Sequence, residues 1–547
     1  MKESYIEGFP QGYKPSNIQT SLIKDIEKAF SSGYKFVVCS APTGSGKSFL
    51  SKTLGNLSRE PSSEFSDLVS SYEIYKRNNY GGYVFSDIVD DEPRFGAFAL
   101  TITKALQDQY KDLFEDTEIL KGRNNYQCTY DEGCAADKAP CLYNKALREQ
   151  CWAKHTCPYY EARNRAVVSR FSSLNYDMFF ALPHHIRQKE YMVCDEASEL
   201  EDQLVKAFSC QVNFETITKS KIKIPVLPST NDYSKIGRWV QNMTLNVEAQ
   251  VEILKEQIQL NKTKIGGVKS VEQTNELVIL QGLHSKLKTL ISTWYDSEYI
   301  VERYDKGINF VPLKVDKLSK NIFDCADKVV LMSATIIDPA AFCKTLGIDK
   351  FKYIEADSTF KASNGPIYVN VKTKLNYNNL RSQLPQIAKQ IQKICDFHKD
   401  EKGVIHTQTN FITNFLKNNI HNDRIIYREQ GVSNADILAQ HTSDTSPTII
   451  ASPSISHGID LKGDLARFQI IIKAPFLPTT DKRVERLMKD DFNWYINKML
   501  GTFIQACGRG IRSKDDFCVT YVLDAAITDM VFKNKNKIPK YFIDRFM

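Results

Sequence analysis

The sequence predicts an α/β protein with two doubly wound lobes. Short, mostly apolar runs recur along the chain, as expected of strands that are buried in a parallel sheet. Helical periodicities separate these runs, and a long helical segment at residues 201–318 interrupts the series. Strands that alternate with helices on both sides of such an insertion favour two open, doubly wound sheets. The runs lie at residues 36–39, 97–101, 191–194, 329–332, 448–451, 469–473 and 519–523.

The composition is that of an ordinary globular protein with several domains. At 547 residues, with 42% apolar and 25% charged residues, the chain is long enough for three or four domains. The net charge of +7 suits a nucleic-acid partner without requiring one, because a local basic groove matters more than the total. No apolar run approaches the ~20 residues that span a membrane, and the N-terminus lacks the apolar core of a signal peptide. We therefore expect a cytoplasmic protein without a membrane partner.

The first apolar run leads directly into a Walker A loop. Residues 41–48 read Ala-Pro-Thr-Gly-Ser-Gly-Lys-Ser, with Ala in place of the usual first Gly. We expect the backbone N–H groups of Gly44, Ser45 and Gly46 to face phosphate oxygens. Lys47 would reach the β- and γ-phosphates, and Ser48 would hold Mg²⁺ at the start of the following helix. This stretch predicts a nucleoside triphosphate site.

Three other features of the sequence bear on this predicted nucleotide site and on the lobe that contains it. Gln19 lies upstream of the loop and could hydrogen-bond an adenine edge, although a solvent-facing role is equally compatible with its position. Residues 58–94 have no clear period and predict a partly mobile surface insertion. Asp195 and Glu196 follow the run at 191–194, where Walker B carboxylates are found. Asp195 would hold Mg²⁺ and Glu196 would polarise the attacking water.

Within the helical segment, two apolar stripes at helical spacing predict a long antiparallel helix pair, joined near Gly266 and Gly267. The stripes are Val247, Val251, Leu254 and Ile258, and Leu277, Leu280, Leu287 and Leu290.

Five of the thirteen cysteines crowd between Cys128 and Cys157. In a reducing compartment such a cluster indicates metal binding rather than disulfides.

The order of these motifs resembles that of the superfamily 2 helicases. The Walker A loop is followed by DEAS at 195–198, SAT at 333–335, HGID at 457–460 and QACGRGIR at 505–512. LKGRNNYQC at 120–128, CPYYEAR at 157–163 and the Asn175-Tyr176 pair narrow the resemblance to the DinG/XPD-like branch. Helicases of that branch carry a [4Fe–4S] cluster in the first motor lobe.

The resemblance implies a domain plan with two RecA-like motor lobes and two insertions. The first lobe would comprise residues 1–119, 166–200 and 319–350, and the second lobe residues 351–547. An iron–sulfur cluster domain would occupy residues 120–165, and a helical arch domain residues 201–318.

The resemblance also implies an activity. The chain would be a monomeric, ATP-dependent DNA helicase that moves 5′→3′ on single-stranded DNA and unwinds forked duplex DNA in repair or replication. Its cofactors would be ATP, Mg²⁺ and the [4Fe–4S] cluster. The alternative is a nucleic-acid-stimulated ATPase or translocase, or a binding protein, without productive unwinding; RNA is not excluded as the substrate.

Residue roles in the second lobe come from the resemblance as well. Gln505, Arg509 and Arg512 match the sixth helicase motif, in which the arginines reach the γ-phosphate. Gly458 and Asp460 match the fifth motif, which couples the nucleotide to DNA. One departure lies in the first lobe, where Ser198 replaces the His that the family commonly has in Walker B.

Four thiolates are the usual ligands of a [4Fe–4S] cluster. The resemblance selects Cys128, Cys151 and Cys157. The remaining ligand would be Cys141 in preference to Cys134, although both stay open. Four thiolates can also hold Zn²⁺.

Overall fold

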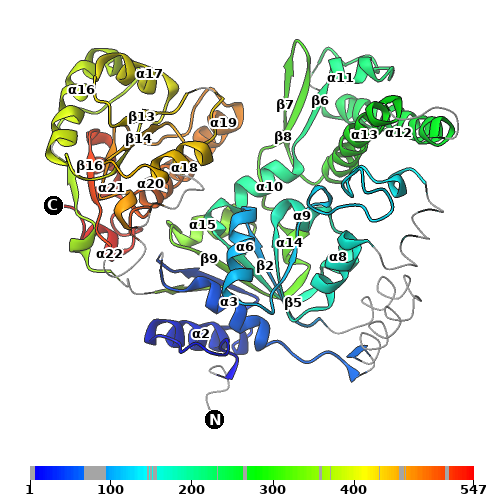
Figure 1. Ribbon diagram of the computed structural model, residues 1–547, viewed down its shortest axis with the longest axis horizontal. Coiled ribbons are helices and arrows are strands. Elements are labelled where there is room, and N and C mark those ends of the chain that lie inside the picture. Colours follow the sequence, from blue (N-terminus) through cyan, green and yellow to red (C-terminus); the bar gives the residue numbers. More distant parts are fainter. Residues whose placement is uncertain are drawn as a thin grey trace. The chain divides into compact units, whose positions relative to one another are not determined.

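The computed structural model (Figure 1) contains two compact units. The first comprises Met1–Val38, Ser48–Leu331 and Cys343–Lys352, and the second comprises Cys39–Lys47, Met332–Phe342 and Tyr353–Met547. The residues that the structure describes are 7–42, 44–63, 65–66, 94–144, 147, 151, 157–230, 232–262, 268–356, 360–369, 371–429, 431–454, 461, 463–511 and 516–547. Most of the predicted surface insertion at 58–94 lies outside these residues.

The first sheet has the strand order β10-β1-β9-β5-β2-β4-β3 among the described residues. Its central strands β2 and β5 are buried throughout and pair in parallel, with Ala97 opposite Tyr191. Burial on both faces explains why these strands are almost uninterrupted apolar runs. The strands are β1 (Phe36–Ser40), β2 (Ala97–Thr101), β3 (Glu118–Leu120), β4 (Phe171–Asn175), β5 (Lys189–Asp195), β9 (Ala326–Ser333) and β10 (Phe351–Glu355).

Helices connect these strands in the βαβ manner. The accompanying helices are α2 (Asn17–Ser31), α3 (Lys47–Asn56), α6 (Lys104–Leu113), α8 (Pro158–Val168), α9 (Tyr176–Ala181), α10 (Leu200–Phe208), α14 (Lys320–Phe323) and α15 (Pro339–Thr345).

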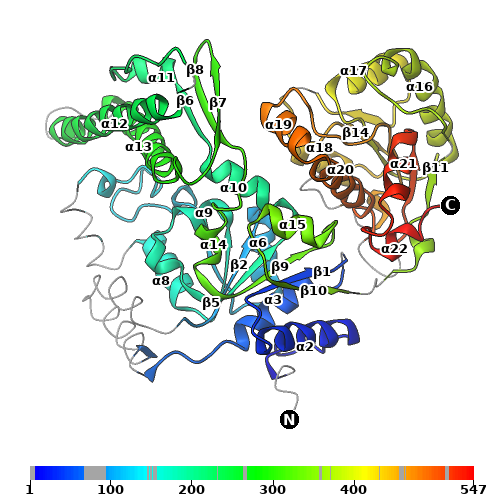
Figure 2. The same ribbon diagram turned by 180° about the vertical axis from the view of Figure 1, so that it is seen from behind.

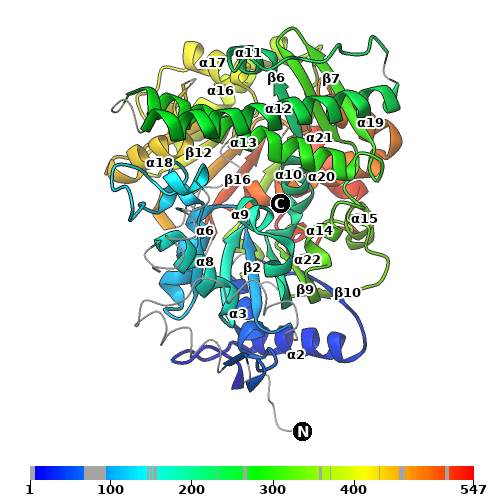
Figure 3. The ribbon, with the colours of Figure 1, turned by 90° about the vertical axis from the view of Figure 1, so that its right-hand side faces the viewer.

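The predicted helix pair is present in the insertion of the first unit. Helices α12 (Tyr233–Lys262) and α13 (Val268–Thr293) run side by side (Figure 3), and every residue of the two predicted apolar stripes is buried. Glu248 of α12 lies 3.4 Å from the Lys288 ammonium near the far end of α13, which makes the pair antiparallel.

The insertion also contains an antiparallel sheet that the helical prediction for 201–318 did not include. Its order is β6-β8-β7, with the strands β6 (Cys210–Asn213), β7 (Tyr299–Tyr304) and β8 (Gly307–Pro312), and α11 (Phe214–Lys219) follows β6. Trp294 joins this sheet to the helix pair, because its ring stacks between Tyr233 at 4.2 Å and Tyr299 at 5.6 Å. Helices and sheet therefore share one hydrophobic core.

The second unit is built on an all-parallel sheet (Figure 2) with the order β11-β16-β15-β12-β14-β13 among the described residues. At its centre, a Cβ atom on Gly403 would come within 2.3 Å of the Phe468 ring, so this close approach of β12 and β15 requires glycine. The strands are β11 (Ile367–Val369), β12 (Gly403–His406), β13 (Ile425–Tyr427), β14 (Ile449–Ser452), β15 (Phe468–Ile471) and β16 (Val519–Val522).

Seven further helices belong to the described part of this unit: α16 (Leu380–Phe397), α17 (Asn410–Asn419), α18 (Asn434–Ser443), α19 (Lys482–Asp490), α20 (Phe492–Cys507), α21 (Ala525–Lys533) and α22 (Lys540–Ile543). The predicted fold class of two doubly wound α/β lobes is confirmed. None of the helices in the described ranges has the length and apolarity to cross a membrane.

We expect Trp294→Ala to destabilise the insertion selectively. The substitution removes the ring that stacks on Tyr233 and Tyr299, and a buried Trp→Ala change costs about 3–5 kcal/mol. Limited proteolysis in increasing urea should cleave within residues 201–318 at a lower concentration than in the unsubstituted chain. Tyr295→Ala, at a neighbouring side chain that is 70% exposed, is the control and should leave this concentration unchanged.

Candidate nucleotide site and cysteine pocket

The Walker A loop has the backbone shape that the sequence predicts. β1 ends at Ser40, and α3 begins at Lys47. Gly44 and Gly46 have φ angles of 79° and 81°, in the left-handed region where a side chain would be strained. Ser45 between them is buried, and its hydroxyl has no hydrogen-bond partner among the described residues. The Ser45 N–H donates to Pro42 O at 3.2 Å, contrary to the expectation that it faces phosphate, whereas a turn of this kind before a helix N-terminus leaves other backbone N–H groups available for an anion.

Asp195 and Glu196 form a second strained turn at the end of β5. Glu196 has φ 51° and ψ 48°, a left-handed conformation that costs a non-glycine residue ~1 kcal/mol. Its backbone N–H donates to Asp195 Oδ1 at 3.0 Å, and the Asp195 side chain is nearly buried. Residues held in this region cluster at functional sites. The turn fixes one oxygen of the carboxylate that we expect to hold Mg²⁺.

Tyr110 contacts the other oxygen of this carboxylate. Its hydroxyl, at the C-terminal part of α6, lies 3.5 Å from Asp195 Oδ2 and 3.0 Å from Ser51 Oγ, and it also interacts with the Ser48 hydroxyl. Burial, together with the negative charge of Asp195, holds the pKa of Tyr110 well above its usual value, so the hydroxyl keeps its proton and can donate. One side chain thus links the start of α3 to the end of β5.

No feature of the sequence singles out Tyr110. Residues 104–110 read as a helix, and an aromatic residue on the buried face of a helix is indistinguishable from ordinary core packing. Only the fold shows that its ring packs against Phe171 while its hydroxyl reaches Ser48 and Asp195.

Gln19 has a structural task in addition to the adenine contact predicted for it. It lies in the first turn of α2, where its Oε1 accepts the Ser16 N–H at 2.9 Å and its own N–H donates to Ser16 Oγ at 3.2 Å. This reciprocal pair is a capping box, which satisfies two donors at the helix start. The contact with adenine stays a prediction.

The residues of the sixth helicase motif begin at the end of α20 in the second unit. Gln505 lies in the last turn, and Arg509 follows the helix, with its N–H donated to Ala506 O at 3.2 Å. Three predicted residues, Gly458, Asp460 and Arg512, lie outside the described residues, so their positions stay predictions.

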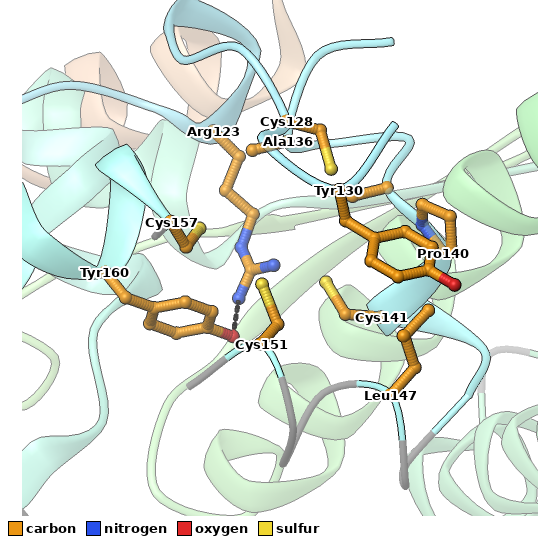
Figure 4. Close-up of a pocket in the computed structure, with 11 residues that line it drawn as sticks. Arg123, Cys128, Tyr130, Ala136, Pro140, Cys141, Leu147, Cys151, Cys157 and Tyr160 are labelled. Carbon is orange, nitrogen blue, oxygen red and sulfur yellow. Dashed lines mark hydrogen bonds between the residues drawn. The ribbon is translucent and has the colours of Figure 1, made fainter. Parts of the chain in front are cut away.

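Four of the five clustered cysteines line one pocket (Figure 4). The pocket is bordered by Cys128, Cys141, Cys151 and Cys157, and the guanidinium of Arg123 lies among their side chains. Cys134 is not part of this lining; its thiol instead contacts the carbonyl of Asp131 at 3.4 Å. The geometry therefore favours the ligand set with Cys141, although the assignment stays a prediction.

This donor set suits a thiolate-bound cluster in its chemistry but not in its present spacing. Four cysteines are the usual ligands of a [4Fe–4S] cluster, and they could also hold Zn²⁺. Within the described ranges, however, no three Cys, His, Asp or Glu side chains stand close enough together to hold a metal ion.

Arg123 and α8 form one wall of the pocket. Cys157 directly precedes α8, and Tyr159 and Tyr160 in the first turn of this helix pack against Arg123. The guanidinium lies 4.5 Å from the Tyr159 ring and 5.1 Å from the Tyr160 ring, and it donates to the Tyr160 hydroxyl at 2.8 Å. A cation held in this way against aromatic faces stabilises negative charge nearby, such as that of thiolates.

Comparisons with known proteins agree with this architecture. Residues 394–543 match the helicase C-terminal domain family. The chain is 20% identical to a probable ATP-dependent helicase of Methanocaldococcus jannaschii, over 82% of this chain and 87% of that protein. A solved XPD helicase has a TM-score of 0.61 at 17% identity, with 96% of this chain and 98% of that chain covered. Xpd4 of S. tokodaii has a TM-score of 0.54 at 12% identity, covering 97% and 99%. As the resemblance seen in the sequence implies, the fold of this chain is that of XPD helicases, and its residues 394–543 match the helicase C-terminal domain.

Proposed function

We propose that this protein is an ATP-dependent DNA helicase that moves 5′→3′ along single-stranded DNA and unwinds forked duplexes. The observation that carries this proposal is the hydroxyl of Tyr110, which contacts Ser48 at the start of α3 and Asp195 at the end of β5. These are the two side chains that helicases of this kind need side by side around Mg²⁺. The proposal is further supported by the XPD-like fold.

Hydrolysis would use the residues of both Walker motifs. Lys47 and the N–H groups of Gly44 and Gly46 bind the phosphates of MgATP, while Ser48 and Asp195 bind its Mg²⁺. Glu196 orients a water molecule and accepts its proton as the water oxygen attacks the γ-phosphorus, and ADP leaves. Gln505, Arg509 and Arg512 stabilise the charge on the γ-phosphate in the transition state.

The nucleic-acid partner would be single-stranded DNA, bound without regard to sequence. A translocating motor must bind phosphates and stack bases at every step, so electrostatic attraction supplies most of its affinity. The direct test is to compare duplexes with a 5′ or a 3′ single-stranded tail. We expect unwinding of the 5′-tailed substrate in the presence of ATP and Mg²⁺; DNA-stimulated ATP hydrolysis without unwinding would favour the alternative, a translocase.

The cysteine pocket would hold a [4Fe–4S] cluster through Cys128, Cys141, Cys151 and Cys157. When bound, the cluster ties four points of a short segment together and supplies folding free energy that this segment cannot gain from its few apolar residues. Arg123, held by Tyr159 and Tyr160, lies where it would offset part of the negative charge of the thiolates. The segment would brace the point at which duplex strands part.

Glu196→Gln should slow hydrolysis while preserving ATP binding. The amide keeps the size of the side chain but cannot accept the proton of the attacking water, and the loss of a general base typically costs on the order of 10²–10⁴ in rate. Single-turnover hydrolysis and equilibrium binding of a fluorescent ATP analogue measure the two steps separately. Glu199→Gln, three residues later, is the control and should hydrolyse ATP normally. Hydrolysis by Glu196→Gln at the unsubstituted rate would remove Glu196 from this role.

Tyr110→Phe should raise the Mg²⁺ concentration that ATP hydrolysis requires. The ring still packs against Phe171, but the hydroxyl that orients Asp195 is lost. Removing a partner that orients a metal ligand weakens metal affinity by roughly 10–100-fold. A Mg²⁺ titration of the initial rate at fixed ATP measures this effect.

Tyr191→Phe provides a matched control for that titration. Tyr191 is also a buried tyrosine of the first unit, on β5, but its hydroxyl donates to Glu27 at 3.3 Å. If Tyr191→Phe raises the required Mg²⁺ concentration as much as Tyr110→Phe does, the effect of Tyr110 is merely structural.

Cys151→Ser should release iron and abolish unwinding, while part of the DNA-stimulated ATP hydrolysis survives. The variant loses one ligand of the proposed cluster, whereas the two motor lobes keep their own cores. Iron content, visible absorbance and both activities should be measured on the same anaerobic preparation. Cys134→Ser is the control, because Cys134 lies outside the pocket lining, and it should retain iron. A Cys151→Ser variant that lacks iron yet unwinds normally would exclude the cluster from strand separation.

A further inference from the structure

Arg545, two residues from the C-terminal Met547, has an unusual environment. Its side chain is 7% exposed and lies in the interior of the second unit. Its guanidinium donates to two backbone carbonyls: Nε donates to Gly365 O at 2.5 Å, and Nη2 donates to Cys507 O at 3.1 Å. The Phe542 ring covers the guanidinium at 5.2 Å. A buried guanidinium keeps its charge, so its contacts must be strong enough to justify its burial.

The carbonyl of Cys507 marks the end of α20. The last carbonyls of a helix have no partner within the helix, and they carry the negative end of its dipole. A cation that donates to such a carbonyl therefore both satisfies the acceptor and stabilises the helix end. In this protein the cap comes from a residue 38 positions further along the chain.

The chain directly after this capped end carries the proposed arginine of the sixth motif. Gly508 donates its N–H to Ile504 O at 3.0 Å, and Arg509 donates its N–H to Ala506 O at 3.2 Å. The Arg509 backbone is therefore held by the same last turn that Arg545 fixes from outside. A catalytic arginine must be placed closely, because a displacement of about 1 Å can cost on the order of 10²-fold in rate.

Two features keep the Arg545 side chain next to the last turn of α20. The C-terminal residues extend the second sheet beside β11: Ile367 donates its N–H to Arg545 O at 2.8 Å, and Met547 donates its N–H to Ile367 O at 3.1 Å. Gly365 leaves room for the guanidinium, because a Cβ atom at this position would lie 2.5 Å from Arg545 Nη2. The C-terminal segment, the start of β11 and the end of α20 meet at this one side chain.

We infer that Arg545 is a positioning residue for Arg509: its guanidinium caps α20 at Cys507 O and fixes the turn that presents Arg509 to the γ-phosphate. This inference rests on the proposed function for the role of Arg509. The position of the turn itself depends only on the contacts in the second unit.

Arg424 offers a matched control in the same unit. It caps the C-terminal end of α16 with donations to Cys395 O at 2.9 Å, His398 O at 2.8 Å and Glu401 O at 2.6 Å. The chemistry is the same as at Arg545, but α16 carries none of the residues proposed for hydrolysis or DNA coupling. Loss of Arg424 should therefore lower stability without moving Arg509.

The test compares full-length Arg545→Met and Arg424→Met by DNA-stimulated ATP hydrolysis and by hydrogen–deuterium exchange. At a temperature at which both variants are folded, Arg545→Met should lower kcat by on the order of tenfold or more, with the KM for ATP little changed. The amides of Gly508 and Arg509 should exchange faster in this variant alone. Arg424→Met should keep its kcat. Arg545→Lys, which can still donate to Cys507 O, should recover part of the kcat and of the protection.

Three results would overturn the inference: a folded Arg545→Met variant with unchanged kcat, equal losses of kcat in both methionine variants, or unchanged exchange at Gly508 and Arg509. If the unsubstituted chain does not hydrolyse ATP, the proposed function fails by itself. The exchange data then still decide whether Arg545 holds the turn, and faster exchange confined to Arg545→Met supports that placement.

Discussion

The contact between Tyr110 and Asp195 is the constraint on which the rest of the proposed nucleotide site depends. The Glu196 N–H donates to one carboxylate oxygen at 3.0 Å, and the Tyr110 hydroxyl lies 3.5 Å from the other and 3.0 Å from Ser51 Oγ. Holding the first oxygen requires a left-handed backbone at Glu196, and holding the second requires α6 to pack beside α3. Because both partners are protein groups, the carboxylate is oriented before any ligand arrives, which lowers the reorganisation needed on binding.

Buried or half-buried cations from distant parts of the chain cap several helix ends in this protein. Lys189 donates to Val167 O and Ser169 O after α8, Arg424 caps α16, and Arg545 caps α20. Each of these side chains satisfies carbonyls that the helix itself leaves unpaired, and the two guanidinium groups also favour the negative end of the helix dipole. Burial lowers the pKa of Lys189 to about 7, so this amine acts mainly as a hydrogen-bond donor. Local capping residues such as glycine would satisfy the same carbonyls, but they would not join the helix end to another element. Capping at long range therefore fixes where a helix ends in space.

The sequence predicted the two lobes because their central strands are buried on both faces. Strands such as β2 and β5 consist of apolar runs that a reader can locate without a structure. The three-residue strands β3 and β13 are too short to show a period, and β7 was missed because its partly exposed Tyr299–Tyr304 run contains charged residues. Motif order located Ser48, Asp195 and Glu196, since their spacing is local.

Tyr110 and Arg545 could not be found in the same way, because their roles arise only when distant elements meet. Tyr110 is 85 residues from Asp195, and Arg545 is 180 residues from Gly365. Neither position departs from the pattern of its own helix or terminus, so no local signal marks it. In the sequence, a hydroxyl or a guanidinium is one polar group among many, and burial next to a specific acceptor is what gives it a function.

A long-range contact of the same kind connects the cysteine pocket, through α8, to the sheet of the first lobe. Cys157 directly precedes α8, Lys189 donates to Val167 O and Ser169 O at the other end of this helix, and Lys189 is the first residue of the strand that ends at Asp195. Lys189 and Asp195 therefore lie at opposite ends of one fully buried strand, β5. Lys189 Nζ also faces the Phe95 ring at 4.9 Å and the Phe98 ring at 5.1 Å, so the far end of α8 is tied to the core of the first sheet. The cysteine pocket and Asp195 therefore lie at the outer ends of α8 and β5, and Lys189 is the side chain that joins the two elements.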